Sequence, residues 1–106
     1  MLNTVTIVGR LIVDPTIEEG KGIITIAVPR PFKNEEGEFD TDNIECRVYK
    51  NILNQTKEYC RKGDIVGIKG RIEADTKYDE EKNIISNSIY IVVERLTFLS
   101  SRHESE

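Results

Sequence analysis

The chain has 106 residues, the size of one domain, and no apolar run in it approaches the roughly 20 residues that a membrane-spanning helix requires. The segment MLNTVTIVGR lacks the basic region and cleavage site of a signal peptide, so we expect a cytoplasmic protein with no membrane partner. The net charge of −4 argues against a nucleic-acid partner. This objection is weakened because five carboxylates are concentrated between Glu35 and Asp42, so the negative charge is unevenly distributed along the chain. Cys46 and Cys60 form no CxxC pair, so we expect buried thiols and no metal site or cofactor.

Two strands are predicted in the first third of the chain. Residues 4–13 alternate between two faces, with Gly9 where a bend or bulge would fit, and Asp14-Pro15 ends this strand. Residues 23–28 are apolar at nearly every position, so we expect this second strand to be covered on both sides.

Pro29 and Pro31 are predicted to end the second strand. The polar stretch over 31–42 is interpreted as a loop, with a hairpin near Glu36-Gly37.

A third strand is predicted over 43–50, because ECRVYKNI alternates between an apolar and a polar side. Residues 51–60 contain no Gly or Pro and have apolar positions at helical spacing, and Lys62-Gly63 is typical of a helix end. Residues 65–74 and 84–99 form the last two predicted strands, and we expect disorder over 100–106.

This order predicts an all-β protein, namely a five-stranded Greek-key OB-fold barrel over residues 1–99, with one helix between the third and fourth strands. Other small β barrels seldom carry a full helix at that point. The sequence contains no catalytic triad, phosphate-binding glycine loop or metal-ligand cluster, so we do not expect an enzyme. Glu45 and Glu73 could lie near each other on adjacent strands and form a carboxylate pair. This is the one enzyme-like feature, and no pocket or second motif accompanies it.

A binding face is the better-supported interpretation. Single-stranded nucleic acid requires cations along its phosphates and flat rings against its bases, and OB barrels bind oligonucleotides on such a face. Tyr59 and Phe98 fit core positions, whereas Phe39 and Tyr90 remain undecided. The outward cations and exposed rings are predicted to be Arg47, Tyr49, Lys69, Arg71, Phe32, Lys33, Lys77 and Tyr78.

Several blocks of the sequence resemble the bacterial single-stranded DNA-binding protein family. These are MLNTVTIVGRL followed by DP, then AVPRPFKNEEGE, CRVYKN and YCRKGDIVGIKGRI, in order from Met1 to about Leu99. The resemblance implies an OB-fold subunit of a homotetramer that wraps single-stranded DNA in replication, recombination or repair, as a nucleoid-associated protein. It places base-stacking rings at Phe32, Tyr49 and Tyr78 and a basic residue at Lys62. Arg10 and Arg30 lie within the first two matched blocks and complete the predicted site.

The chain departs from the family pattern at several positions. It has no tryptophan, Asn43 stands where a further aromatic residue is expected, and Glu45 and Glu73 place acid on the predicted face. The ending SSRHESE lacks the acidic, Phe-ended tip that recruits replication and repair proteins, so the sequence is either truncated or that of a short relative without this role.

Two alternative functions remain open from the sequence. One is an OB-fold protein-interaction module, for example a replication or primosome accessory with weak or no DNA binding. The other is an RNA-binding OB domain, which would use the same stacking physics.

Overall fold

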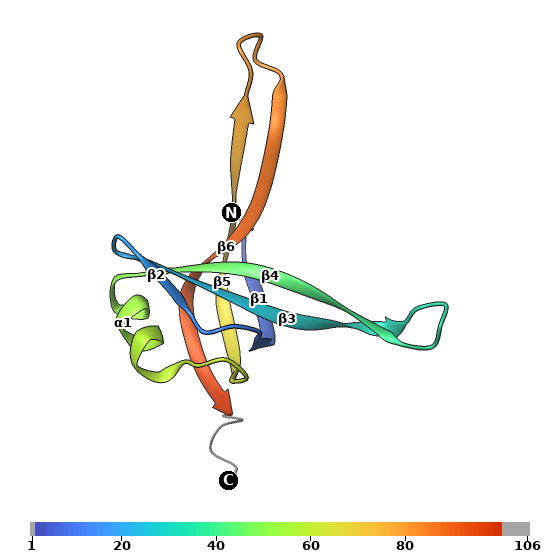
Figure 1. The fold of residues 1–106 in the computed structure, drawn as a ribbon, viewed down its shortest axis with the longest axis vertical. Coiled ribbons are helices and arrows are strands. Elements are labelled where there is room, and N and C mark those ends of the chain that lie inside the picture. Colours follow the sequence, from blue (N-terminus) through green and yellow to red (C-terminus); the bar gives the residue numbers. More distant parts are fainter. Residues whose placement is uncertain (1, 101–106) are drawn as a thin grey trace.

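The structure, a computed structural model, describes residues 2–100. Within that range the chain forms six strands and one helix (Figure 1). In chain order they are β1 (Val5–Leu11), β2 (Thr16–Glu18), β3 (Lys21–Lys33), β4 (Phe39–Tyr49), α1 (Lys50–Tyr59), β5 (Ile65–Tyr78) and β6 (Ile84–Ser100).

Five of the strands close into a barrel. The sheet runs β1-β5-β6-β4-β3-β2, and an additional β1–β3 pairing joins its two sides. β4 and β6 run parallel, pairing Cys46 with Ile91 and Arg47 with Val92, while the other pairings are antiparallel. The predicted OB-fold barrel with a helix after its third long strand is therefore confirmed. The three-residue β2 was missed because it is too short to show an alternating pattern.

Strand alternation builds the core. The inward residues of β3 and β4 are almost completely inaccessible, including Ile24, Ile26 and Val48. Helix α1 contacts β3, β4 and β6 and contributes the buried Leu53 to the same cluster. Burying one such aliphatic side chain contributes about 1.5–3 kcal/mol, so the stability of the domain depends on this set.

Both cysteines lie in this core, as predicted. Cys46 and Cys60 are free thiols and fully buried. Burial raises the pKa of Cys46 to about 12, so this thiol stays protonated near neutral pH and acts as a small apolar group.

The prediction that Pro29 and Pro31 end the second strand is wrong. β3 continues through both prolines to Lys33 and pairs with β4 across a bulge between Pro29 and Lys33. The predicted loop over 31–42 is thus largely a hairpin that projects from the barrel (Figure 1). Proline is tolerated there because, outside the barrel, β3 has one neighbour and its other edge needs no N–H donor. The turn itself is close to the predicted position, with Gly37 at a φ of +81°.

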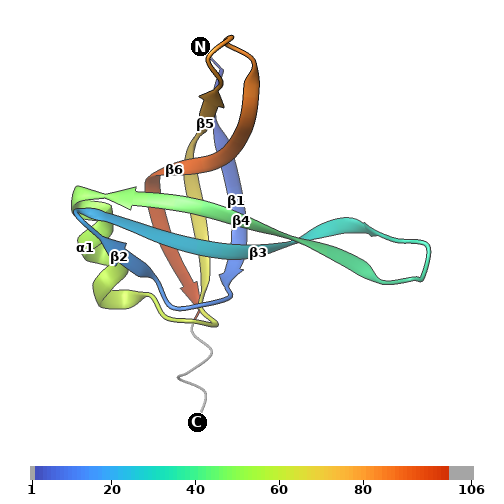
Figure 2. The same cartoon turned by 45° about the horizontal axis from the view of Figure 1, so that its top comes forward.

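A second hairpin, formed by β5 and β6, projects in another direction (Figure 2). β5 continues past Ala74 to Tyr78, so the predicted end of this strand was too early. Ile72 and Ala74 are both exposed because the hairpin has left the barrel at that point. Asp79 closes the turn by accepting backbone N–H groups of Glu81 and Asn83.

Aromatic placement corrects further expectations. Tyr59 and Phe98 were expected in the core but are 58% and 40% exposed, respectively. Of the two undecided rings, Tyr90 is buried and Phe39 is exposed. Ser100 pairs with Ile65, so β6 includes the first residue of the expected disordered tail, and residues 101–106 lie outside the described range.

Gly70 lies on β5 at an irregularity in its pairing with β6, and its replacement tests the barrel packing. A methyl group at this position would overlap the backbone carbonyl of Val92, which cannot move without breaking the strand pairing. We expect Gly70→Ala to lower the free energy of unfolding by about 1–3 kcal/mol or more, measured by urea denaturation. The control is Gly67→Ala on the same strand, where the nearest atom, Leu99 Cδ1, would lie at 3.6 Å. Equal stabilities of the two variants would contradict this packing.

Candidate nucleic-acid interface

The outer face of β4 carries the Arg and Tyr side chains that the sequence singles out. Because Cys46 and Val48 point into the core, alternation directs Arg47 and Tyr49 to the opposite side. Tyr49 is 37% exposed and occupies the N-cap position of α1 in an extended conformation. The barrel and the helix start therefore fix its backbone while the ring remains accessible.

Arg47 is held by two carboxylates and one ring. Its Nε donates to Glu45 Oε2 at 2.8 Å and its Nη2 to Asp75 Oδ2 at 3.2 Å. Its Cζ lies over the Tyr90 ring, 3.6 Å from the centroid. The hydrogen bond to Glu45 and the two negative charges raise the pKa of Arg47 further above its already high value, so the guanidinium is permanently charged.

Arg71 belongs to a neighbouring network on the same face. Its Nε and Nη2 donate to Glu73 Oε2 at 3.1 and 2.8 Å, and its Nη1 donates to Glu94 Oε2 at 3.2 Å. Tyr90 connects the two networks, because its hydroxyl donates to Glu73 Oε1 at 3.1 Å. Burial and this hydrogen bond raise the pKa of Tyr90, which keeps the hydroxyl protonated.

These contacts determine the charge of the face. Two arginines face four carboxylates, so the predicted cations of the central face are already neutralised. Exposed ion pairs contribute only about 0–1 kcal/mol, so a phosphate could still compete for Arg71. Glu45 and Glu73 each bind a separate arginine, and their strands β4 and β5 are separated by β6 rather than adjacent as expected.

The β3–β4 hairpin presents three of the predicted residues. Phe32 is 68% exposed, and Lys33 Nζ lies 5.8 Å from the centroid of the Phe39 ring. Arg30 binds Asp42 through two hydrogen bonds of 3.0 and 2.8 Å. The hydrogen bond from Arg30 lowers the pKa of the Asp42 carboxyl, so this pair stays ionised and Arg30 is neutralised as well.

The β5–β6 hairpin presents Lys77 and Tyr78, both exposed. By alternation Lys77 shares the face of Asp75 and Arg71, whereas Tyr78 points to the opposite side. Because this hairpin stands clear of the barrel, both of its sides are open to solvent (Figure 1).

The remaining predicted residues are Arg10, Lys62 and Lys69. Arg10 is partly buried and donates from Nη1 to the Gly63 carbonyl at 2.9 Å, which is a structural contact between β1 and the turn before β5. The side chain of Lys62 is exposed near that turn, where its backbone N–H donates to Asp14. Lys69 is exposed on β5 opposite Thr6 of β1.

Sequence reasoning missed Asp75, Glu94 and Tyr90 as parts of the interface. Asp75 follows Glu73 in the same alternating phase of β5. A predicted strand that continued past Ala74 would therefore have placed Asp75 on the same face as Glu73. Glu94 and Tyr90 reach the arginines through the β5–β6 register, which a single strand pattern does not contain.

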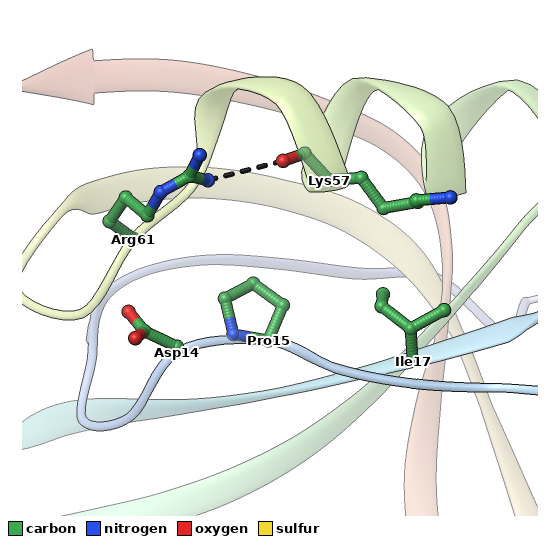
Figure 3. Close-up of a pocket in the computed structure, with 5 residues that line it drawn as sticks. All are labelled: Asp14, Pro15, Ile17, Lys57 and Arg61. Carbon is green, nitrogen blue, oxygen red and sulfur yellow. Dashed lines mark hydrogen bonds between the residues drawn. The ribbon is translucent and has the colours of Figure 1, made fainter.

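A separate hollow of about 280 Å³ lies beside α1 (Figure 3). Asp14, Pro15 and Ile17 line one side, and Lys57 and Arg61 line the other. Arg61 Nη1 donates to the Lys57 carbonyl at 3.1 Å and so helps to terminate the helix. No residue of the predicted interface lines this hollow.

Within residues 2–100, no group of His, Cys, Asp and Glu side chains is arranged to hold a metal ion. The same range contains no helix with the length and apolar character needed to cross a membrane.

The chain is similar to known proteins along nearly its whole length. The model of the Single-strand binding protein family matches residues 2–99. The Single-stranded DNA-binding protein of Lactiplantibacillus plantarum is 35% identical over 111 residues, covering 100% of this chain but 55% of that protein. Single-stranded DNA-binding protein B of Bacillus subtilis is 38% identical over 86 residues, which is 76% of each chain. The chain therefore spans little more than half the length of the first relative.

Two solved structures share the fold. A Plasmodium falciparum SSB in complex with ssDNA superposes with a TM-score of 0.77 at 21% identity, covering 94% of this chain and 97% of that one. The small single-stranded DNA-binding protein from Streptomyces coelicolor gives a TM-score of 0.72 at 16% identity, with coverages of 96% and 99%. The fold agrees with these structures and the sequence with the family model over nearly its whole length, so the chain belongs to the single-strand binding protein family.

Proposed function

We propose that this chain binds single-stranded DNA with little sequence preference and protects it during replication, recombination or repair. The observation that carries the proposal is the outer face of β4, where Tyr49 is exposed beside Arg47 on a barrel of this family. Relatives at 35% and 38% identity are named single-stranded DNA-binding proteins, which supports the same ligand for this chain. The role is one of binding and requires no catalysis.

The proposed mechanism combines stacking rings with phosphate-binding lysines. Phe32, Tyr49 and Tyr78 are all exposed, so each can take a base on its flat face. Among residues 2–100, no carboxylate forms an ion pair with Lys33, Lys69 or Lys77. These lysines therefore offer phosphates more accessible positive charge than the neutralised arginines do, and Arg10 and Lys62 would act at the periphery.

A homotetramer within the nucleoid of the cytoplasm is part of the proposal. Ile84, Ile85 and Ile89 are each more than 60% exposed on the β5–β6 hairpin, and an apolar surface of this kind favours association.

A second candidate, a protein-interaction module, is favoured by one observation. Arg30, Arg47 and Arg71 are all paired with carboxylates, which reduces the attraction of the face for phosphate. The following titration discriminates between the two functions.

We expect oligo-dT to bind at low salt and the binding to weaken as salt rises. The lysine contacts release counterions, so log K should fall against log salt with a slope of about −0.7 per neutralised phosphate. Fluorescence anisotropy at several salt concentrations measures this slope, and a matched RNA oligomer as competitor tests the preference for DNA. Absence of binding at low salt would refute the proposed function and leave the protein-interaction module.

Tyr49→Ala should weaken oligo-dT binding by about 1–3 kcal/mol, because one base loses its stacking partner. The corresponding decrease is about 5- to 150-fold in affinity, at an unchanged salt slope. Tyr59→Ala is the matched control, since Tyr59 is also an exposed tyrosine but lies on α1. Equal affinities of the Tyr49 variant and the parent would show that this ring does not contact the strand.

A further inference from the structure

We propose that Arg47 binds a nucleobase through the flat outer face of its guanidinium, and that Tyr90, Glu45 and Asp75 hold it in position as a stacking platform. This inference rests on the proposed function and changes the role of Arg47 from a phosphate ligand to a base ligand. Glu45, Asp75 and Tyr90 are positioning residues in this arrangement.

The distance between Arg47 and Tyr90 fixes the orientation of the guanidinium. Its Cζ lies 3.6 Å from the ring centroid. A partial double C–N bond is about 1.33 Å long, so a nitrogen pointing at the ring would lie only about 2.3 Å from it, well inside contact distance. This distance excludes a single nitrogen pointing at the ring centre and fits a guanidinium that lies along the ring, with one face covered by Tyr90 and the other left for a base.

The nitrogens at the edge of the Arg47 guanidinium donate hydrogen bonds to carboxylates. Nε donates to Glu45 and Nη2 to Asp75, so two of its three nitrogens already have acceptors. A phosphate that binds Arg47 through two hydrogen bonds would have to displace one of these carboxylates. It would also have to approach the remaining negative charges of the face. A neutral base meets no such repulsion.

Stacking on the remaining face requires no contact to be broken. The Arg47 side chain keeps 17% of its surface exposed, although a ring covers one face and carboxylates occupy two edges. Guanidinium planes and aromatic rings both stack on bases in single-stranded nucleic acids. Tyr49 lies two residues further along β4 on the same side, about 6.6 Å away at 3.3 Å per residue, so the strand would present two successive platforms.

Arg47→Lys tests this role because lysine keeps the positive charge but lacks the planar guanidinium group. We expect the variant to bind oligo-dT at least about fivefold more weakly than the parent at an unchanged salt slope. Arg61→Lys, an exposed substitution beside α1, serves as the control for a general arginine-to-lysine effect. The same titrations are repeated with an oligomer of abasic deoxyribose phosphates, on which parent and Arg47→Lys should bind equally.

The outcomes separate the two roles of Arg47. Parent-like binding of oligo-dT by Arg47→Lys would overturn the platform, because a phosphate ligand tolerates lysine. A weakening that persists on the abasic strand, or a changed salt slope, would also overturn it. Failure of the parent protein to bind oligo-dT would instead refute the proposed function.

Discussion

The alternation of β4 between core and solvent is the constraint on which the interface depends. β4 lies between β3 and β6, and its inward side chains Cys46 and Val48 have no accessible surface. A shift of the register by one residue would turn Arg47 into the core, and burying an unpaired charge costs several kcal/mol. The core therefore keeps Arg47 and Tyr49 outside, and the stability of the barrel and the position of the interface have the same origin.

The two hairpins present further exposed rings beyond the barrel. Each consists of strands that have lost one neighbour, so prolines, charges and exposed rings are tolerated there. Phe32 and Tyr78 lie on these hairpins, while Tyr49 lies on the barrel itself. Because the central arginines are neutralised by acids, affinity for a nucleic acid would depend more on stacking than on charge. Such a surface would be less sensitive to salt than one made of unpaired arginines.

The sequence was sufficient for the features that depend on local periodicity. The helix, the sequence of long strands around it and the buried Cys46 followed from alternation and helical spacing. The extended β3 did not, because proline ends a strand with two neighbours but is allowed at a free edge, and edges depend on the tertiary fold. The same reason explains Asp75 and Tyr90: their contacts with Arg47 depend on strand register and on how far β5 extends, which local patterns do not contain.

Photo-crosslinking of the chain to an oligomer containing halogenated deoxyuridine, with the linked residues identified by mass spectrometry, tests whether the outer face of β4 binds the strand. We expect crosslinks on this face at Tyr49 and on the two hairpins at Phe32 and Tyr78. Crosslinks confined to α1 and the hollow beside it, with none on β4, would contradict this expectation.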